Sequence, residues 1–164
     1  MGNPGDFHVW VLVDESILIS AFHELSADGV PQIDTFPPAD SSMPAATVLA
    51  TAASAKVSKA GIEMIVDARS LDMAVAVLRS ERSFNSDHID AFTKEVQGKL
   101  IVDRDAPGGN EGESVPTFET VLDYWRPDVL VTLNPQRRGR YTRDPVAVSP
   151  AQWIRRCIEV VRTS

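Results

Sequence analysis

Cysteine is almost absent from this chain: Cys157 is the single one among 164 residues, so no disulfide can form within the chain. Cys157 lies in an apolar pattern of helical period, which predicts a core position rather than a nucleophile. Long apolar runs are also absent, and none approaches the roughly 18 residues needed to cross a bilayer. The start of the chain lacks the basic region and apolar stretch of a signal peptide. We therefore expect a cytoplasmic protein without a membrane segment.

An excess of positive charge is missing as well. The net charge is −7, which excludes the class of generally basic nucleic-acid-binding proteins. A local basic segment is nevertheless present, because four arginines lie close together in the sequence: Arg137, Arg138, Arg140 and Arg143. This segment is either a solvated loop or a patch that grips phosphate beside an acidic site.

Several catalytic motifs are lacking too. No glycine-rich loop opens the first predicted helix, which argues against a Rossmann or P-loop nucleotide site, and no Gly-x-Ser-x-Gly element is present. His8, His23 and His88 do not have the spacing of metal ligands. Carboxylates are the remaining candidates, and hard cations such as Mg²⁺ and Mn²⁺ prefer oxygen ligands of this kind.

Hydrophobic patterning predicts an alternation of strands and helices. Strands are expected over 8–13, 62–66, 100–102, 128–133 and 146–148. Helices are expected over 15–25, 45–60, 70–80, 86–98, 116–125 and from 149 onward, with loops over 26–44, 103–115 and 134–144. Such alternation is typical of a mostly parallel sheet with helices on both faces. We expect a three-layer α/β/α fold in a single domain over residues 8–164, preceded by a flexible N-terminus over 1–7.

The stretch VWVLVDESILIS (9–20) is the most informative part of the sequence. An apolar run ends at Asp14 and a second apolar pattern follows at once, which predicts a buried strand whose carboxyl end presents a carboxylate. Ligands bind outside the carboxyl ends of strands in open α/β sheets. Asp14 is therefore either a functional acid or an N-cap of the following helix.

Other polar residues are predicted near helix starts and strand ends. Asp72 lies early in the helix over 70–80, Glu119 lies at the start of a later helix, and Asn134 follows the strand over 128–133. For the two acids the alternative is a solvated first-turn residue favoured by the helix dipole. For Asn134 it is an ordinary turn residue before a proline.

Three stretches resemble the PIN-domain family of metal-dependent ribonucleases, which includes VapC-type toxins. They are VLVDESILISAF (11–22), with an acid followed by a small polar residue and an apolar helix, DVLVTLN (128–134), and VAVSPAQWI (146–154). Two positions depart from the family pattern. Met73 stands where the family has its second acid, with Asp72 beside it, and the helix containing Glu119 and Asp123 is about three residues short.

The resemblance implies a Mg²⁺- or Mn²⁺-dependent endoribonuclease, with metal-activated water attacking an RNA phosphodiester. Asp14, Asp72 and Glu119 would bind the metal, and Asn134 would assist through a water. The implied substrate contacts are Ser16, Thr132, Arg137, Arg138 and Arg140. The implied partners are RNA, an antitoxin protein and a second copy of the chain in a homodimer. The alternatives are a PIN-like module that binds RNA or protein without catalysis and, less well matched, a receiver-like regulator, which would need a late lysine that is missing here.

Overall fold

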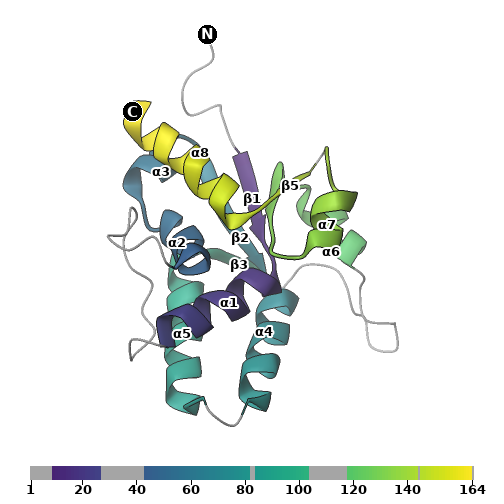
Figure 1. Cartoon of the computed structure of the whole chain (residues 1–164). Helices are drawn as coiled ribbons and strands as arrows, with labels where there is room; N and C mark the ends of the chain where they lie inside the picture. Colours follow the sequence, from purple (N-terminus) through teal and green to yellow (C-terminus); the bar gives the residue numbers. More distant parts are fainter. Residues whose placement is uncertain (1–8, 27–42, 82–83, 104–117, 144, 164) are drawn as a thin grey trace.

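The computed structural model describes residues 9–26, 43–81, 84–103, 118–143 and 145–163 (Figure 1). The strands in these ranges are β1 (Val9–Val13), β2 (Ile62–Asp67), β3 (Ile101–Asp103), β4 (Val129–Val131) and β5 (Val146–Val148). The helices are α1 (Glu15–Ser26), α2 (Pro44–Thr51), α3 (Ala55–Lys59), α4 (Ala68–Ser80), α5 (Ser86–Lys99), α6 (Phe118–Trp125), α7 (Pro135–Arg140) and α8 (Pro150–Thr163). The predicted flexible segment over 1–7 lies outside the described residues.

The five strands form one parallel sheet in the order β3-β2-β1-β4-β5. The chain therefore adds strands on one side of β1 first, and then returns to add β4 and β5 on the other side. This reversal between β1 and β4 is a topological switch point, and in open α/β sheets ligands bind at such a point, outside the carboxyl ends of the strands.

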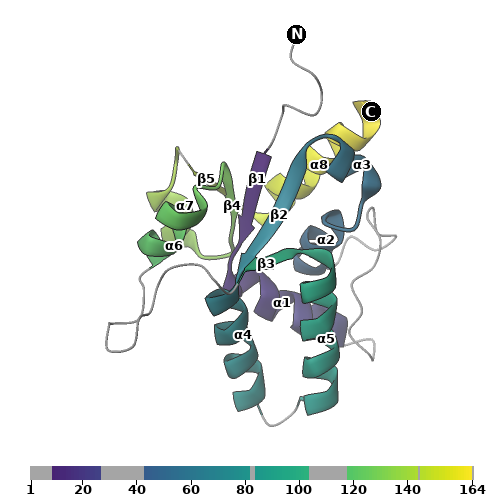
Figure 2. The ribbon, with the colours of Figure 1, turned by 180° about the vertical axis from the view of Figure 1, so that it is seen from behind.

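Alternate residues of the strands enter two separate cores, because successive side chains in a strand point to opposite faces. Val11 and Val13 belong to the larger core, which the buried sides of α1, α2, α4, α5 and α8 complete. Leu12 belongs to the smaller core, together with Val121 and Leu122 of α6. Figure 2 shows α6 and α7 set apart from the other helices. The predicted three-layer α/β/α fold with a parallel sheet is thus confirmed.

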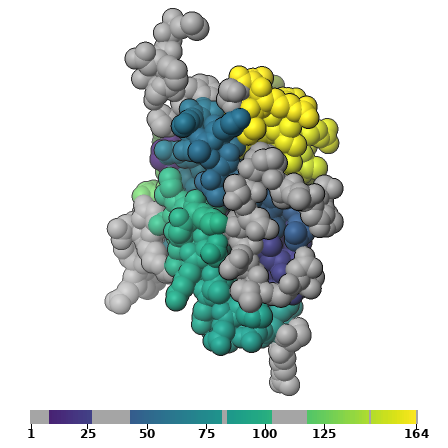
Figure 3. Space-filling model, turned by 90° about the vertical axis from the view of Figure 1, so that its left-hand side faces the viewer, coloured from purple at the N-terminus to yellow at the C-terminus, as the bar shows by residue number. Residues whose placement is uncertain are grey.

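The larger core is closed at its outer side by α8, which contacts α2 and α3. Figure 3 shows this side of the molecule, with α8 in yellow next to the blue α2–α3 segment. Cys157 is fully buried in α8, and burial raises the pKa of its thiol to about 12, although a hydrogen bond with Thr51 lowers it. The prediction of a core cysteine is confirmed, and such a thiol is a poor nucleophile.

Two local predictions were wrong. The single helix expected over 45–60 is broken into α2 and α3, because the Ser54 side chain accepts a hydrogen bond from the Val57 N–H and starts a new helix. The loop expected over 134–144 contains the short helix α7, which Asn134 caps and Pro135 begins. No helix within the described ranges is both long and apolar enough to span a membrane.

Candidate functional site

Buried polar side chains lie in a row at the switch point. The pairing of β1 with β4 extends to Val13 and Val131, so Asp14 and Thr132 are the next residues of each strand. Asp67 ends β2 at the corresponding level on the other side of β1. Asp14, Thr132 and Asp67 are all fully buried. A charged or polar group in such a place must be paired, because leaving it without a partner is costly.

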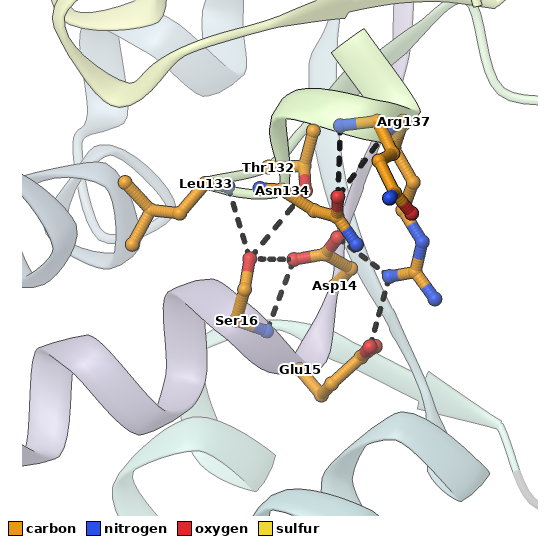
Figure 4. A network of polar contacts seen from close by, with 8 residues as sticks. Asp14, Glu15, Ser16, Thr132, Leu133, Asn134 and Arg137 are labelled. Atoms are coloured by element: carbon orange, nitrogen blue, oxygen red, sulfur yellow. Dashed lines mark hydrogen bonds and ion pairs between the residues drawn. The ribbon is translucent and has the colours of Figure 1, made fainter. Parts of the chain in front are cut away.

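The two oxygens of Asp14 have different partners (Figure 4). Oδ1 accepts hydrogen bonds from the backbone N–H of Ser16 at 3.1 Å and from the Ser16 hydroxyl. Oδ2 accepts a hydrogen bond of 2.8 Å from NH1 of Arg137. Asp14 therefore does cap the start of α1 as one interpretation predicted, but this uses only one of its oxygens.

Arg137 is the counter-ion of the site. Its NH1 lies 2.8 Å from Asp14 Oδ2 and 2.9 Å from Glu15 Oε1, and its Cζ lies 3.7 Å from the centre of the Phe118 ring. Burial lowers the pKa of the guanidinium, but the hydrogen bonds and charges of Asp14 and Glu15 outweigh burial and raise it overall. Two carboxylates and one aromatic ring therefore fix both the charge and the plane of this side chain.

The end of β4 is tied to the start of α1 through hydroxyl groups. The Leu133 N–H donates a hydrogen bond of 3.0 Å to the Ser16 hydroxyl, which also lies 3.4 Å from Thr132 Oγ1. Thr132 Oγ1 accepts a 3.0 Å hydrogen bond from the Asn134 N–H. Asn134 Oδ1 in turn accepts from the N–H groups of Gln136 and Arg137, as an N-cap does. Asn134 thus positions α7 and with it Arg137.

The remaining predicted residues are placed elsewhere. Asp72 is exposed on α4. Glu119 of α6 forms an ion pair with Arg140 at 3.0 Å and accepts a hydrogen bond of 3.2 Å from the Tyr141 hydroxyl. In the part of the chain that the structure describes, no group of three His, Cys, Asp or Glu residues is placed to hold a metal ion. The structure therefore brings Ser16, Thr132, Asn134 and Arg137 to Asp14, but not the two other predicted metal ligands.

Asp67 is a buried acid that the sequence prediction missed. Its Oδ1 accepts hydrogen bonds of 2.9 Å from the Arg69 backbone N–H and side-chain Nε, and its Oδ2 accepts 2.9 Å hydrogen bonds from Arg69 NH2 and from Trp125 Nε1. Burial raises the pKa of this carboxyl, but the hydrogen bonds and the Arg69 charge outweigh burial and hold it below its ordinary value. The signal was present in the sequence, because Asp67 directly follows the apolar run 64–66 as Asp14 follows 11–13.

Compared with protein-family models, with curated proteins and with solved structures, the chain matches none of them.

Proposed function

We propose that this protein binds single-stranded RNA at the switch point, with Arg137 as the residue that takes a backbone phosphate. The observation on which this proposal rests is the fixed orientation of the Arg137 guanidinium between Asp14, Glu15 and the Phe118 ring. A guanidinium has five N–H donors in a rigid fork, and a fork that is already oriented loses little side-chain entropy when it binds. The two carboxylates therefore orient the Arg137 guanidinium for phosphate binding and do not occupy all of its donors.

The donors of Arg137 divide into two groups. Both hydrogen bonds to carboxylates, those to Asp14 and Glu15, leave from NH1. Among the described residues, Nε and the second terminal nitrogen have no hydrogen-bond partner, and in Figure 4 that nitrogen points away from Asp14. The two oxygens of a phosphate fit such a free edge in a bidentate manner. The side chain is one-fifth exposed, so part of it is open to solvent.

Neighbouring groups on α7 favour an anionic ligand with several phosphates. Arg138 is partly buried, and its Nε is a buried donor without a hydrogen-bond partner within the described chain. Gln136 and Arg140 are exposed on the same short helix. Arg140 is paired with Glu119, which reduces its contribution. We therefore assign the predicted basic segment to RNA backbone binding, with Arg137 and Arg138 as its principal donors.

A metal-dependent ribonuclease is the second candidate. It is supported by the fully buried Asp14 at a topological switch point, which is where a catalytic acid is expected. The placement of Asp72 and Glu119 favours the binding module over this enzyme. Mn²⁺-dependent cleavage of single-stranded RNA that is lost in Asp14→Asn, with the fold intact by circular dichroism, would establish the nuclease. Membership of the PIN family, a cognate antitoxin and a homodimer stay predictions of the resemblance, and a cytoplasmic location stays a prediction of the sequence composition.

Fluorescence anisotropy of a labelled single-stranded RNA as a function of salt tests the proposal. Each lost phosphate contact reduces the slope of log K against log salt by roughly 0.7. Arg137→Lys retains the charge but not the fork, so we expect weaker binding with a nearly unchanged slope. Arg138→Ala should weaken binding and reduce the slope by roughly 0.7, the amount expected for one phosphate contact.

Arg79→Ala on α4 is the matched control. This arginine forms an exposed ion pair with Asp90, and its removal changes the net charge by the same amount as Arg138→Ala. RNA affinity should barely respond to it. Equal responses to the Arg138 and Arg79 variants, or an Arg137→Lys variant with wild-type affinity, would show that the RNA does not bind at the switch point.

A further inference from the structure

We propose that the cavity between α6 and the chain before β5 accepts an unstacked guanine base of the bound RNA. The cavity has a volume of about 430 Å³, within the usual range for sites that take small ligands. Its lining includes Leu122, Asp123, Arg126, Asp128 and Tyr141. This inference rests on the RNA-binding function proposed above and adds base specificity to it.

The cavity lies beside the proposed phosphate site. The Arg137 guanidinium stacks on one ring, Phe118, whose centroid lies 6.0 Å from that of Tyr141 in the cavity wall. Arg137 and Tyr141 also belong to one short segment, since the Tyr141 N–H donates a 2.9 Å hydrogen bond to the Arg137 carbonyl at the end of α7. A nucleotide with its phosphate on Arg137 would therefore have its base next to the cavity.

The lining offers both a stacking surface and hydrogen-bond acceptors. Tyr141 is partly exposed and presents an aromatic ring of the kind on which unstacked RNA bases stack. Asp128 is held in place because its Oδ2 accepts a 2.9 Å hydrogen bond from the Trp10 N–H. Asp123 is exposed and has no hydrogen bond or ion pair among the described residues. Its carboxylate is therefore available to a ligand.

The chemistry of these groups selects guanine among the four bases. Guanine presents N1–H and N2–H donors side by side, and one carboxylate can accept both. Its O6 and N7 acceptors suit an arginine, and Arg126 supplies one at the cavity wall. Adenine has no N1–H, so it cannot make the paired contact with a carboxylate. A bare metal ion fits less well, because no three carboxylates within the described chain are placed to hold one.

Arg126 reaches the cavity because of how α6 ends. Its backbone N–H donates a 2.8 Å hydrogen bond to the Leu122 carbonyl, and its φ of 47° is left-handed. This conformation stops a helix and usually belongs to glycine. The chain then turns through Pro127 into Asp128, so that α6 and the start of β4 form two walls of one cavity.

The test compares two labelled RNAs of equal length that differ only by one central base, guanine or adenine, in an otherwise all-uracil strand. We expect the wild type to bind the guanine strand about tenfold more tightly, which corresponds to one good bidentate contact. Asp123→Asn should reduce this ratio to about one, because the amide replaces one of the two acceptor oxygens by an NH₂ group, which is itself a donor. Asp87→Asn on α5, an exposed acid of the same charge, should retain the ratio.

The ratio does not depend on overall charge, so it separates base recognition from the general gain in RNA affinity when an acid is removed. RNA binding that depends on Arg137 but shows no preference for guanine, or a preference that survives Asp123→Asn, would overturn the guanine pocket while leaving the RNA function standing. If no RNA binds at all, the proposed function fails. A titration with guanosine alone then tests whether the cavity binds the base. Changes in the amide resonances of Leu122 and Tyr141 on titration with guanosine would support the pocket, and unchanged resonances would overturn it.

Discussion

Trp125 Nε1 donates a hydrogen bond of 2.9 Å to Oδ2 of Asp67, and this contact joins α6 to the carboxyl end of β2. Arg69 of α4 donates hydrogen bonds to both oxygens of the same carboxylate. Asp67 therefore links α4, α6 and the sheet. Its neighbour Asp14 is held by Arg137 in a comparable way. Two adjacent strands thus end in buried acids that arginines neutralise.

Asp67→Asn should destabilise the protein by about 2 to 3 kcal/mol, because removal of one partner from a buried pair leaves the other uncompensated. This expected loss is smaller than the largest losses measured for buried ion pairs, because the Arg69 side chain is 27% exposed and solvent screens its charge. Urea unfolding followed by circular dichroism measures it. Asp90→Asn, which breaks an exposed pair with Arg79, should cost less than about 1 kcal/mol.

The same carboxylate should make stability depend on acid pH. The folded pKa of Asp67 is below its ordinary value, so its contribution is present above the unfolded pKa of about 3.9 and is lost as the pH falls through the folded pKa. The wild type should therefore lose stability more steeply than Asp67→Asn below about pH 4. Parallel curves for the two proteins in that range would show that Asp67 does not contribute in this way.

Arg137 and Asp14 should show strong thermodynamic coupling. Arg137→Met leaves a buried carboxylate without its counter-ion, and we expect a loss of about 3 kcal/mol. The double variant Asp14→Asn/Arg137→Met removes both charges, so it should recover much of that loss. A double-mutant cycle by chemical unfolding measures the coupling. Additive effects would mean that the two side chains do not interact in solution.

Mn²⁺ should distinguish a binding module from a metal enzyme. Arg137 already supplies positive charge to Asp14 and Glu15, so millimolar Mn²⁺ should leave the melting temperature of the wild type unchanged. Arg137→Ala removes this charge, and Mn²⁺ should then stabilise the variant by binding to the folded state. A clear rise in the melting temperature of the wild type would instead favour the nuclease.

Glu24 should stabilise the start of α2. Its two oxygens accept hydrogen bonds from the N–H groups of Ala45 at 3.2 Å and Ala46 at 2.8 Å. These donors have no partner within the helix, and loss of a capping side chain typically costs about 1 kcal/mol. Glu24→Ala should show this loss in thermal unfolding. Glu95→Ala, which removes a partly exposed i,i+4 pair with Lys99, should cost about half as much or less.

The parallel sheet and the position of Asp14 were predictable because both depend on local sequence. An apolar run that ends in a polar residue marks a strand and its carboxyl end. Thr132 and Asn134 followed from the same logic for β4. Asp67 was missed because the predicted strand stopped at 66 and the next helix was placed two residues later than α4 begins.

The partners of these residues were not predictable from the sequence. Arg137 and Asp14 are 123 positions apart, and no local pattern shows that a basic segment turns back onto the first strand. Glu119 and Asp72 failed to join the site for a related reason. Periodicity indicates which face of a helix is buried but not which face of the sheet it covers, and α6 lies on the smaller core while α4 lies on the larger one.

The contact of Glu24 with α2 bears on residues 27–42, which connect α1 to α2. Since a side chain of α1 itself holds the first turn of α2, the packing of these helices does not depend on the length of residues 27–42. Loop-closure entropy grows only slowly with length. Insertions in this stretch should therefore leave the carboxyl ends of β1 and β2 and their arginine-paired acids unchanged, which makes it a suitable place to attach a label.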